Sequence, residues 1–101
     1  MRTIGKFKIK YSFWITSRRG FVIVGNPLEG TVRIGCIVTF NTGFEYITHK
    51  INGIERGRSS TEGDVIYGLT LLCKDEEERK KFETLKLPEH IVEIIEEGTF
   101  S

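Results

Sequence analysis

Apolar and polar residues alternate at the start of the chain. From residue 6 to residue 15, aromatic and aliphatic side chains alternate with lysines and a serine, which is the period of a half-buried β-strand. This pattern predicts a first strand over residues 6–15, ending where Trp14 and Ile15 break the alternation. The predicted inward row consists of Phe7, Ile9, Tyr11 and Phe13.

Four glycines, five residues apart, divide the next stretch into short segments rich in β-branched residues. Glycine inside a strand marks a bulge or a barrel corner, because it lets another backbone approach closely. The spacing predicts strands over residues 21–24, 31–34 and 36–40, with a turn over residues 26–30. The glycines are Gly20, Gly25, Gly30 and Gly35.

The middle of the chain predicts a turn at residues 41–43, a strand over 46–54, a polar surface loop over 55–64 and a strand over 65–72. The register of the 46–54 strand stays open, because several residues compete for its inward positions. These competitors are Ile47, Lys50 or Ile51, and Ile54.

The character of the sequence changes at Asp75, which can cap a helix, with Glu78 three residues later expected to close a capping box. A helix over about residues 76–85 is expected, docked by Phe82 and Leu85. Residues 91–95 are rich in β-branched side chains and predict a last strand, with a second helical turn as the alternative.

The glycine-rich stretch also resembles a known family. The pattern Arg19-Gly20-x-Val22-x-x-Gly25, followed by Gly30-Thr31-Val32-x-Ile34-Gly35, resembles the second domain of translational GTPases such as elongation factor Tu. The resemblance covers roughly residues 6 to 73. It implies a small β-barrel that packs against other protein domains and contacts RNA. Asn26-Pro27 departs from the family pattern, and proline is confined to strand edges, starts and bulges.

These patterns together predict one domain over residues 1–101. We expect a mainly β fold, a small antiparallel β-barrel of the translation-factor second-domain type. Its strands occupy about residues 6–72, and one short α-helix lies near the C-terminus. Closing a sheet into a barrel removes exposed edges, which suits a chain of this length.

Charge is divided unevenly along the chain. Residues 1–58 carry ten Lys or Arg and three Glu, a net charge of +7, whereas residues 59–101 carry five Lys or Arg and eleven acids, a net charge of −6. Two readings follow: the basic half attracts an anionic partner such as RNA, or the acidic half folds over it and neutralises it.

The sequence offers little catalytic chemistry. The segment from Gly25 to Thr31 imitates the glycine spacing of a phosphate loop but lacks its lysine and leads into a strand, so no nucleotide binding is expected. His49 and His90 stand in no metal-ligand spacing, and His49 is expected to be a surface or half-buried residue. No nucleophile motif occurs. We therefore expect no enzyme, no metal site and no cofactor.

Two further features bear on location. Cys36 and Cys73 form no CxxC pair and are expected to be buried free thiols. The N-terminal residues do not look like a signal peptide, and no apolar run reaches the ~20 residues of a membrane helix. A cytoplasmic protein without membrane contact is expected.

A binding surface is the remaining hypothesis. Aromatic residues at Trp14, Phe44 and Tyr46 are suited to stack on bases or to fill a partner's pocket. The first hypothesis is a non-catalytic interaction module that binds a protein partner or its own copy. The alternative is an RNA- or ribosome-binding accessory protein that uses the basic face. The candidate binding residues are Arg18, Arg19, Lys50, Arg56 and Arg58.

Overall fold

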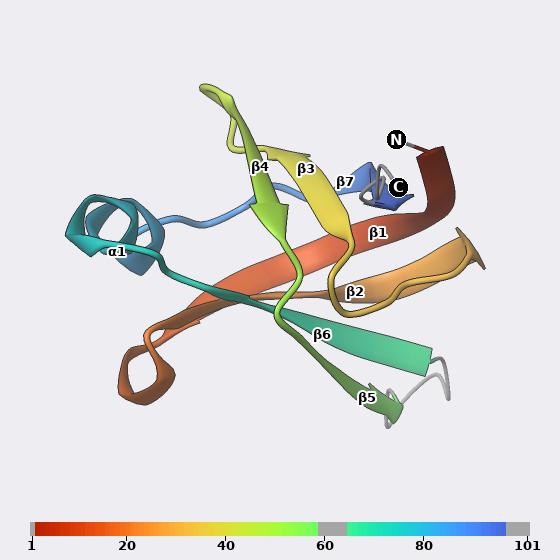
Figure 1. Cartoon of the computed structure of the whole chain (residues 1–101), viewed down its shortest axis with the longest axis horizontal. Coiled ribbons are helices and arrows are strands. Elements are labelled where there is room, and N and C mark those ends of the chain that lie inside the picture. The colour runs from red at the N-terminus through yellow and green to blue at the C-terminus, as the bar shows by residue number, and fades with distance from the viewer. Residues whose placement is uncertain (1, 59–64, 97–101) are drawn as a thin grey trace, which may run out of the picture.

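A computed structural model describes residues 2–58 and 65–96, and shows one antiparallel sheet with a short helix at one end (Figure 1). The strands follow the order β4-β3-β7-β1-β2-β6-β5 across the sheet. The predicted class, mainly β with one short helix near the C-terminus, is confirmed. The elements are β1 (Arg2–Ile15), the 3-10 turn η1 (Thr16–Arg18), β2 (Gly20–Gly30), β3 (Ile37–Asn41), β4 (Tyr46–Lys50), β5 (Gly53–Arg58), β6 (Val65–Leu72), α1 (Glu76–Glu83) and β7 (His90–Glu96).

The sheet is strongly curled but its ladder is not closed, because β4 and β5 form its two ends. These end strands follow one another in the chain and are joined by Ile51 and Asn52. The amide of Ile51 donates to the carbonyl oxygen of Cys36, just before β3, at 2.8 Å. The amide of Asn52 donates to the carbonyl oxygen of Thr70 in β6, also at 2.8 Å. The two joining residues therefore form hydrogen bonds with both ends of the open sheet.

The second strand is longer than predicted. β2 runs without a break from Gly20 to Gly30, so the predicted turn at residues 26–30 and the strand at 31–34 are wrong; residues 31–36 form a turn region instead. Pro27 is tolerated because pairing with β6 ends at Gly25, which leaves β1 as the only described neighbour of this part of β2. The side-chain amide of Asn26 donates to the carbonyl oxygen of Val65 at 2.8 Å, where the ladder has ended.

The predicted strand over residues 46–54 is two strands. Its first part, β4, pairs with β3, and the second part, β5, pairs with β6 and extends through Arg58. The prediction of a loop over residues 55–64 is therefore wrong for residues 55–58, and residues 59–64 lie outside the described residues. The break at Ile51 and Asn52 settles the open register, since Ile51 is fully buried while Lys50 is exposed.

The predicted helix and last strand are present. Asp75 caps α1 by accepting the amide of Glu78 at 2.8 Å, but Glu78 accepts the amide of Lys74 rather than that of the cap residue. The helix ends at Glu83, two residues before the predicted end, and β7 makes residues 91–95 a strand. Phe82 is fully buried and Leu85 packs against the core, as expected.

The core lies on the concave side of the curled sheet. Its centre is aromatic: the ring of Phe82 on α1 lies 5.1 Å from that of Phe21 on β2, which in turn lies 6.3 Å from that of Phe40 on β3. The helix thus contributes one large side chain to the core built by the strands. The fully buried residues of this cluster are Phe7, Ile9, Phe21, Ile23, Val38, Phe40, Ile51, Leu69, Leu71, Phe82 and Ile94.

A bulge in β1 changes which of its residues face this core. The pairing with β2 shifts by one between Ile9 and Tyr11, so Lys10 has no partner on β2. Because side chains alternate along a strand, one extra residue moves every later side chain to the other face. Tyr11 and Phe13 are therefore 55% and 43% exposed, and the predicted inward row is correct only for its first two members.

Candidate interaction surface

The bulge creates an apolar patch on the convex side of the sheet. Phe21 and Ile23 of β2 belong to the inner core, so Val22 and Val24, which alternate with them, point to the opposite face. Phe13 lies opposite Val22, and Tyr11 lies opposite Val24. Residues that are directly opposite in a sheet share a face, so both aromatic residues join the two valines on the convex side.

Two rows of residues, each with one residue from β1, β2, β6 and β5, cross the convex side of the sheet. We call the surface formed by these two rows the outer face. Its ridge, formed by Tyr11 and Phe13 on β1, is separated by β2 from β6 and β5. The first row is Phe13, Val22, Thr70 and Gly53, and the second is Tyr11, Val24, Gly68 and Glu55.

The outer face is apolar at its centre. Val22 and Val24 are each only 7% exposed although neither belongs to the inner core cluster, so their neighbours on the outer face cover them. The rings of Tyr11 and Phe13 are stacked with their centroids 6.3 Å apart. Two exposed aromatic side chains beside two buried valines form a continuous apolar patch, unlike single exposed apolar residues scattered over a surface.

A hollow of about 370 Å³ lies on the β5 and β6 side of this face. Its floor includes Gly53 and Thr70 from the first row, and Leu72 and Ile34 supply exposed apolar side chains, 45% and 64% exposed. Arg18 and Glu55, joined by an ion pair of 3.1 Å, also line it. The ridge and the hollow therefore lie on opposite sides of β2.

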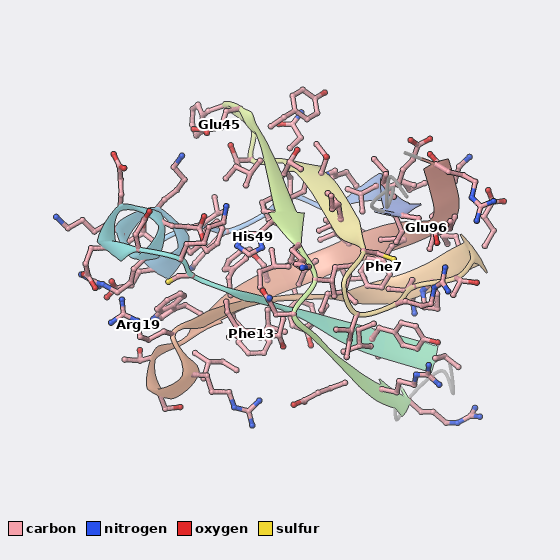
Figure 2. All side chains as sticks on the ribbon, in the orientation of Figure 1. Phe7, Phe13, Arg19, Glu45, His49 and Glu96 are labelled. Atoms are coloured by element: carbon pink, nitrogen blue, oxygen red, sulfur yellow. The ribbon has the colours of Figure 1, made fainter. Side chains whose placement is uncertain are left out.

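The five candidate binding residues come from three places in the fold: the connection between β1 and β2, strand β4 and strand β5. Arg18 and Arg19 lie in the connection between β1 and β2, but Arg18 pairs with Glu55 on β5 and Arg19 with Glu76 on α1, at 2.6 Å. Figure 2 shows Arg19 beside α1 at the end of the molecule away from Glu96. The remaining candidates are on β4 and β5: Lys50, Arg56, whose guanidinium lies 5.4 Å from the Tyr67 ring centroid, and Arg58.

The acidic half of the chain pairs with the basic half. Among the residues that the structure describes, basic side chains of the first half pair with acids of the second: Arg19 with Glu76, Lys8 with Glu89 at 3.4 Å, and Arg2 and Arg33 with Glu96 at 2.7 and 3.5 Å. Lys81 of the second half pairs with Glu45 of the first at 3.2 Å. Of the two readings of the uneven charge, these contacts favour mutual neutralisation over a continuous basic face.

Two of these carboxylates have perturbed acidity. Hydrogen bonds from Arg19, and then from Arg79, hold the pKa of Glu76 below its usual value of 4.5. The hydrogen bond from Arg2 lowers the pKa of Glu96 in the same way. A carboxylate whose pKa is lowered by folding stabilises the fold above its unfolded pKa, and this stabilisation is lost as the pH falls through the folded pKa.

Acid is therefore expected to weaken the attachment of α1. Glu76→Gln removes the carboxylate that Arg19 and Arg79 share, so its unfolding midpoint falls less than that of the parent protein between pH 6 and pH 3. Urea titrations at several pH values, followed by the fluorescence of the single tryptophan, measure this difference. Glu77→Gln, an exposed neighbour on the same turn, is the control. Equal acid sensitivity of the parent and Glu76→Gln proteins contradicts the role assigned to Glu76.

His49 differs from the expectation of a surface or half-buried residue. It is only 4% exposed; Nε2 lies 3.0 Å from Oε1 of Glu78 and Nδ1 lies 2.7 Å from the carbonyl oxygen of Lys50. The ring also packs against Phe82, with 5.7 Å between centroids. Figure 2 places it between β4 and α1. These contacts assign His49 to the attachment of the helix.

Other candidate chemistry is sparse. Cys36 is buried, as expected, whereas Cys73 is half-buried, and neither forms a disulfide. In residues 2–58 and 65–96 no three His, Cys, Asp or Glu side chains gather in a way that holds a metal ion. No helix in those ranges has the length and hydrophobicity to cross a membrane.

Of the aromatic residues proposed from the sequence, Trp14 is half-buried against the core. Phe44 and Tyr46, at the turn between β3 and β4, are 98% and 73% exposed. They lie away from the outer face. The ridge residues Tyr11 and Phe13 were missed because their alternation with polar residues continues without a break through the bulge.

Comparison with known protein families, curated proteins and solved structures found no significant match.

Proposed function

We propose that the chain is a non-catalytic interaction module that binds a protein partner or a second copy of itself through the outer face, in the cytoplasm. The observation that carries the proposal is the pair of exposed aromatic rings, Tyr11 and Phe13, stacked beside Val22 and Val24 on a regular sheet. Aromatic side chains held rigidly at the centre of an apolar patch supply much of the binding free energy in protein interfaces.

We also propose that the fold is of the translation-factor barrel type. The support comes from Ile51 and Asn52, which join the two end strands and bond to Cys36 on one side and Thr70 on the other. In a barrel of this kind the convex side of every strand is available for contacts, which fits a module whose interior is filled by its own core.

The RNA-binding alternative has weaker support. Arg18 and Arg19, two of the five candidate cations, pair with carboxylates of this chain. An RNA-binding surface predicts affinity for single-stranded RNA that falls steeply with added salt. Binding that is tight at low salt and lost at 200 mM salt would favour this alternative over the protein-binding module.

Matched aromatic variants test the outer face. We expect a protein-binding assay, by pull-down from a cell extract together with sedimentation of the pure chain, to detect a specific protein or self-association. Phe13→Ser should weaken either interaction at least about tenfold, as for other central aromatic residues. Phe44→Ser is the control, because it removes a 98% exposed ring outside the outer face and should change neither result.

A parent protein that sediments as a monomer at all concentrations and retains no specific protein contradicts the proposal. Equal binding by the parent and Phe13→Ser proteins also contradicts it, because the interaction then lies elsewhere on the molecule.

A further inference from the structure

Two bulges, one in β1 and one in β2, lie beside a second and larger hollow. Lys10 has no partner on β2 or β7, and Leu28 has no partner on β1 or β6. Both residues line a hollow of about 570 Å³, together with Lys8 and Asn26, which lie opposite each other on β1 and β2. We call it the lysine hollow. A bulge changes the direction of a side chain, and bulges often lie next to functional sites.

The lysine hollow continues the outer face along β1 and β2. Val24 and Asn26 are two residues apart on β2, so their side chains lie about 7 Å apart on the same side of the sheet. The pairing of β2 with β6 has ended at Asn26, whose side-chain amide donates to the carbonyl oxygen of Val65 at 2.8 Å. A partner segment that covers Tyr11 and Val24 therefore reaches the lysine hollow with its next residues.

The lysine hollow combines positive charge with an aliphatic wall. Leu28 and Val65, which are 48% and 40% exposed, supply the wall. Lys10 is half-buried, and among the residues that the structure describes no carboxylate forms an ion pair with it. Lys8 pairs with Glu89 at 3.4 Å, so two lysines and one glutamate leave the hollow with a net charge of +1. One carboxylate beside Lys10 balances this charge.

We infer that the partner is a protein segment that is both acidic and aliphatic, with a carboxylate against Lys10 and a large aliphatic side chain against Leu28 and Val65; this inference rests on the proposed function. Opposite charges across an interface select the partner and fix its register. RNA fits less well, because Glu89 repels successive phosphates. In addition, none of the described residues that line the hollow is aromatic, so they offer no ring for a base to stack on.

A set of matched peptides tests the two parts of this chemistry. The probe is the peptide Gly-Gly-Leu-Glu-Leu-Gly-Gly with both termini blocked. One control peptide replaces its glutamate with glutamine, and the other replaces both leucines with alanine. Titration of isotope-labelled protein with up to about 1 mM peptide, followed by the amide NMR signals, should shift the signals of Lys10 and Leu28. Each control peptide should bind at least about fivefold more weakly, because it lacks the charge or the apolar contact.

Matched protein variants test the same contacts from the other side. Lys10→Gln removes the ammonium group but keeps most of the aliphatic stem, and Leu28→Ser removes part of the wall. Each should raise the dissociation constant of the probe peptide at least about fivefold. Lys80→Gln is the control, since Lys80 is an exposed lysine on α1, at the other end of the molecule from the last residues of β2 (Figure 1). Circular dichroism checks folding, and Lys10→Met or Leu28→Ala replaces a variant that does not fold.

The outcomes separate this inference from the proposed function. A probe peptide that shifts no signal, or that binds no better than its glutamine control, overturns the inference. Single-stranded RNA that binds more tightly than the peptide and is weakened by Lys10→Gln overturns it as well, because the hollow then takes phosphates. If the chain retains a protein through Phe13 and Lys10→Gln and Leu28→Ser retain it equally, the inference falls and the interaction module stands. A monomer that retains no protein overturns both.

Discussion

Gly25→Ala is expected to destabilise the fold by about 3 kcal/mol or more, because a methyl group has no space there. A Cβ built at Gly25 lies 1.9 Å from the carbonyl oxygen of Lys8 and 2.8 Å from its carbonyl carbon. Both are backbone atoms of β1 at the bulge, so β1 and β2 have to separate to accept alanine. Thermal unfolding followed by tryptophan fluorescence should show a midpoint lowered by more than about 10 °C for a domain of this size.

Gly57→Ala is the matched control on another strand. A Cβ at Gly57 meets no atom within 4 Å, and its backbone does not require glycine. The stability of this variant should lie within about 0.5 kcal/mol of the parent protein, since surface substitutions away from special features have small effects. If Gly25→Ala is as stable as Gly57→Ala, β1 and β2 do not approach at the bulge as closely as described.

The glycine pattern shows what the sequence could predict. Close backbone approach was expected at the regularly spaced glycines, and it occurs at Gly25 and at Gly30, whose Cβ would lie 2.1 Å from the carbonyl oxygen of Ile4. The predicted strand interruptions were wrong over residues 26–30, because a glycine that permits close packing does not have to end a strand. Glycine spacing indicated where strands cross closely, but not where each strand stops.

The outer face shows what local pattern cannot predict. Simple alternation puts Tyr11 and Phe13 on the same face of the sheet as Phe7 and Ile9. The extra residue Lys10 instead puts the second pair on the opposite face from the first. Such a bulge depends on pairing with a second strand, so no property of residues 6–15 alone reveals it. The only sign of the bulge in the sequence is that two apolar residues, Trp14 and Ile15, follow Phe13. In the structure Trp14, and not Phe13, packs against the core.

The ion pairs of two candidate cations were beyond the reach of the sequence for a related reason. The charges of Arg18 and Arg19 were read from the sequence, but their partners come from residues far along the chain. Arg19 and Glu76 are 57 residues apart, and Arg18 and Glu55 are 37 residues apart. Charge pairing of this kind depends on the folded topology, which the sequence predicted only in outline.

Glu78→Ala is expected to have the second large effect, a loss of about 3 kcal/mol of stability. Oε1 of Glu78 accepts from the amide of Lys74 and contacts Nε2 of the buried His49, each at 3.0 Å. The other ring nitrogen of His49 faces the carbonyl oxygen of Lys50, which only accepts hydrogen bonds. Removing the Glu78 carboxylate therefore leaves Nε2 of the buried His49 ring without its partner.

A graded series separates this buried contact from general effects on the helix. Glu78→Gln keeps an oxygen acceptor in the same place but removes the charge, so it should cost about 1 kcal/mol. Glu77→Ala, on the exposed side of the same turn, should lie within about 0.5 kcal/mol of the parent protein. Urea unfolding measures the stability of all three variants. Equal losses for Glu77→Ala and Glu78→Ala would mean that both act only through helix propensity. The attachment of α1 would then depend on Phe82 and the Arg19 pair, without the contact between His49 and Glu78.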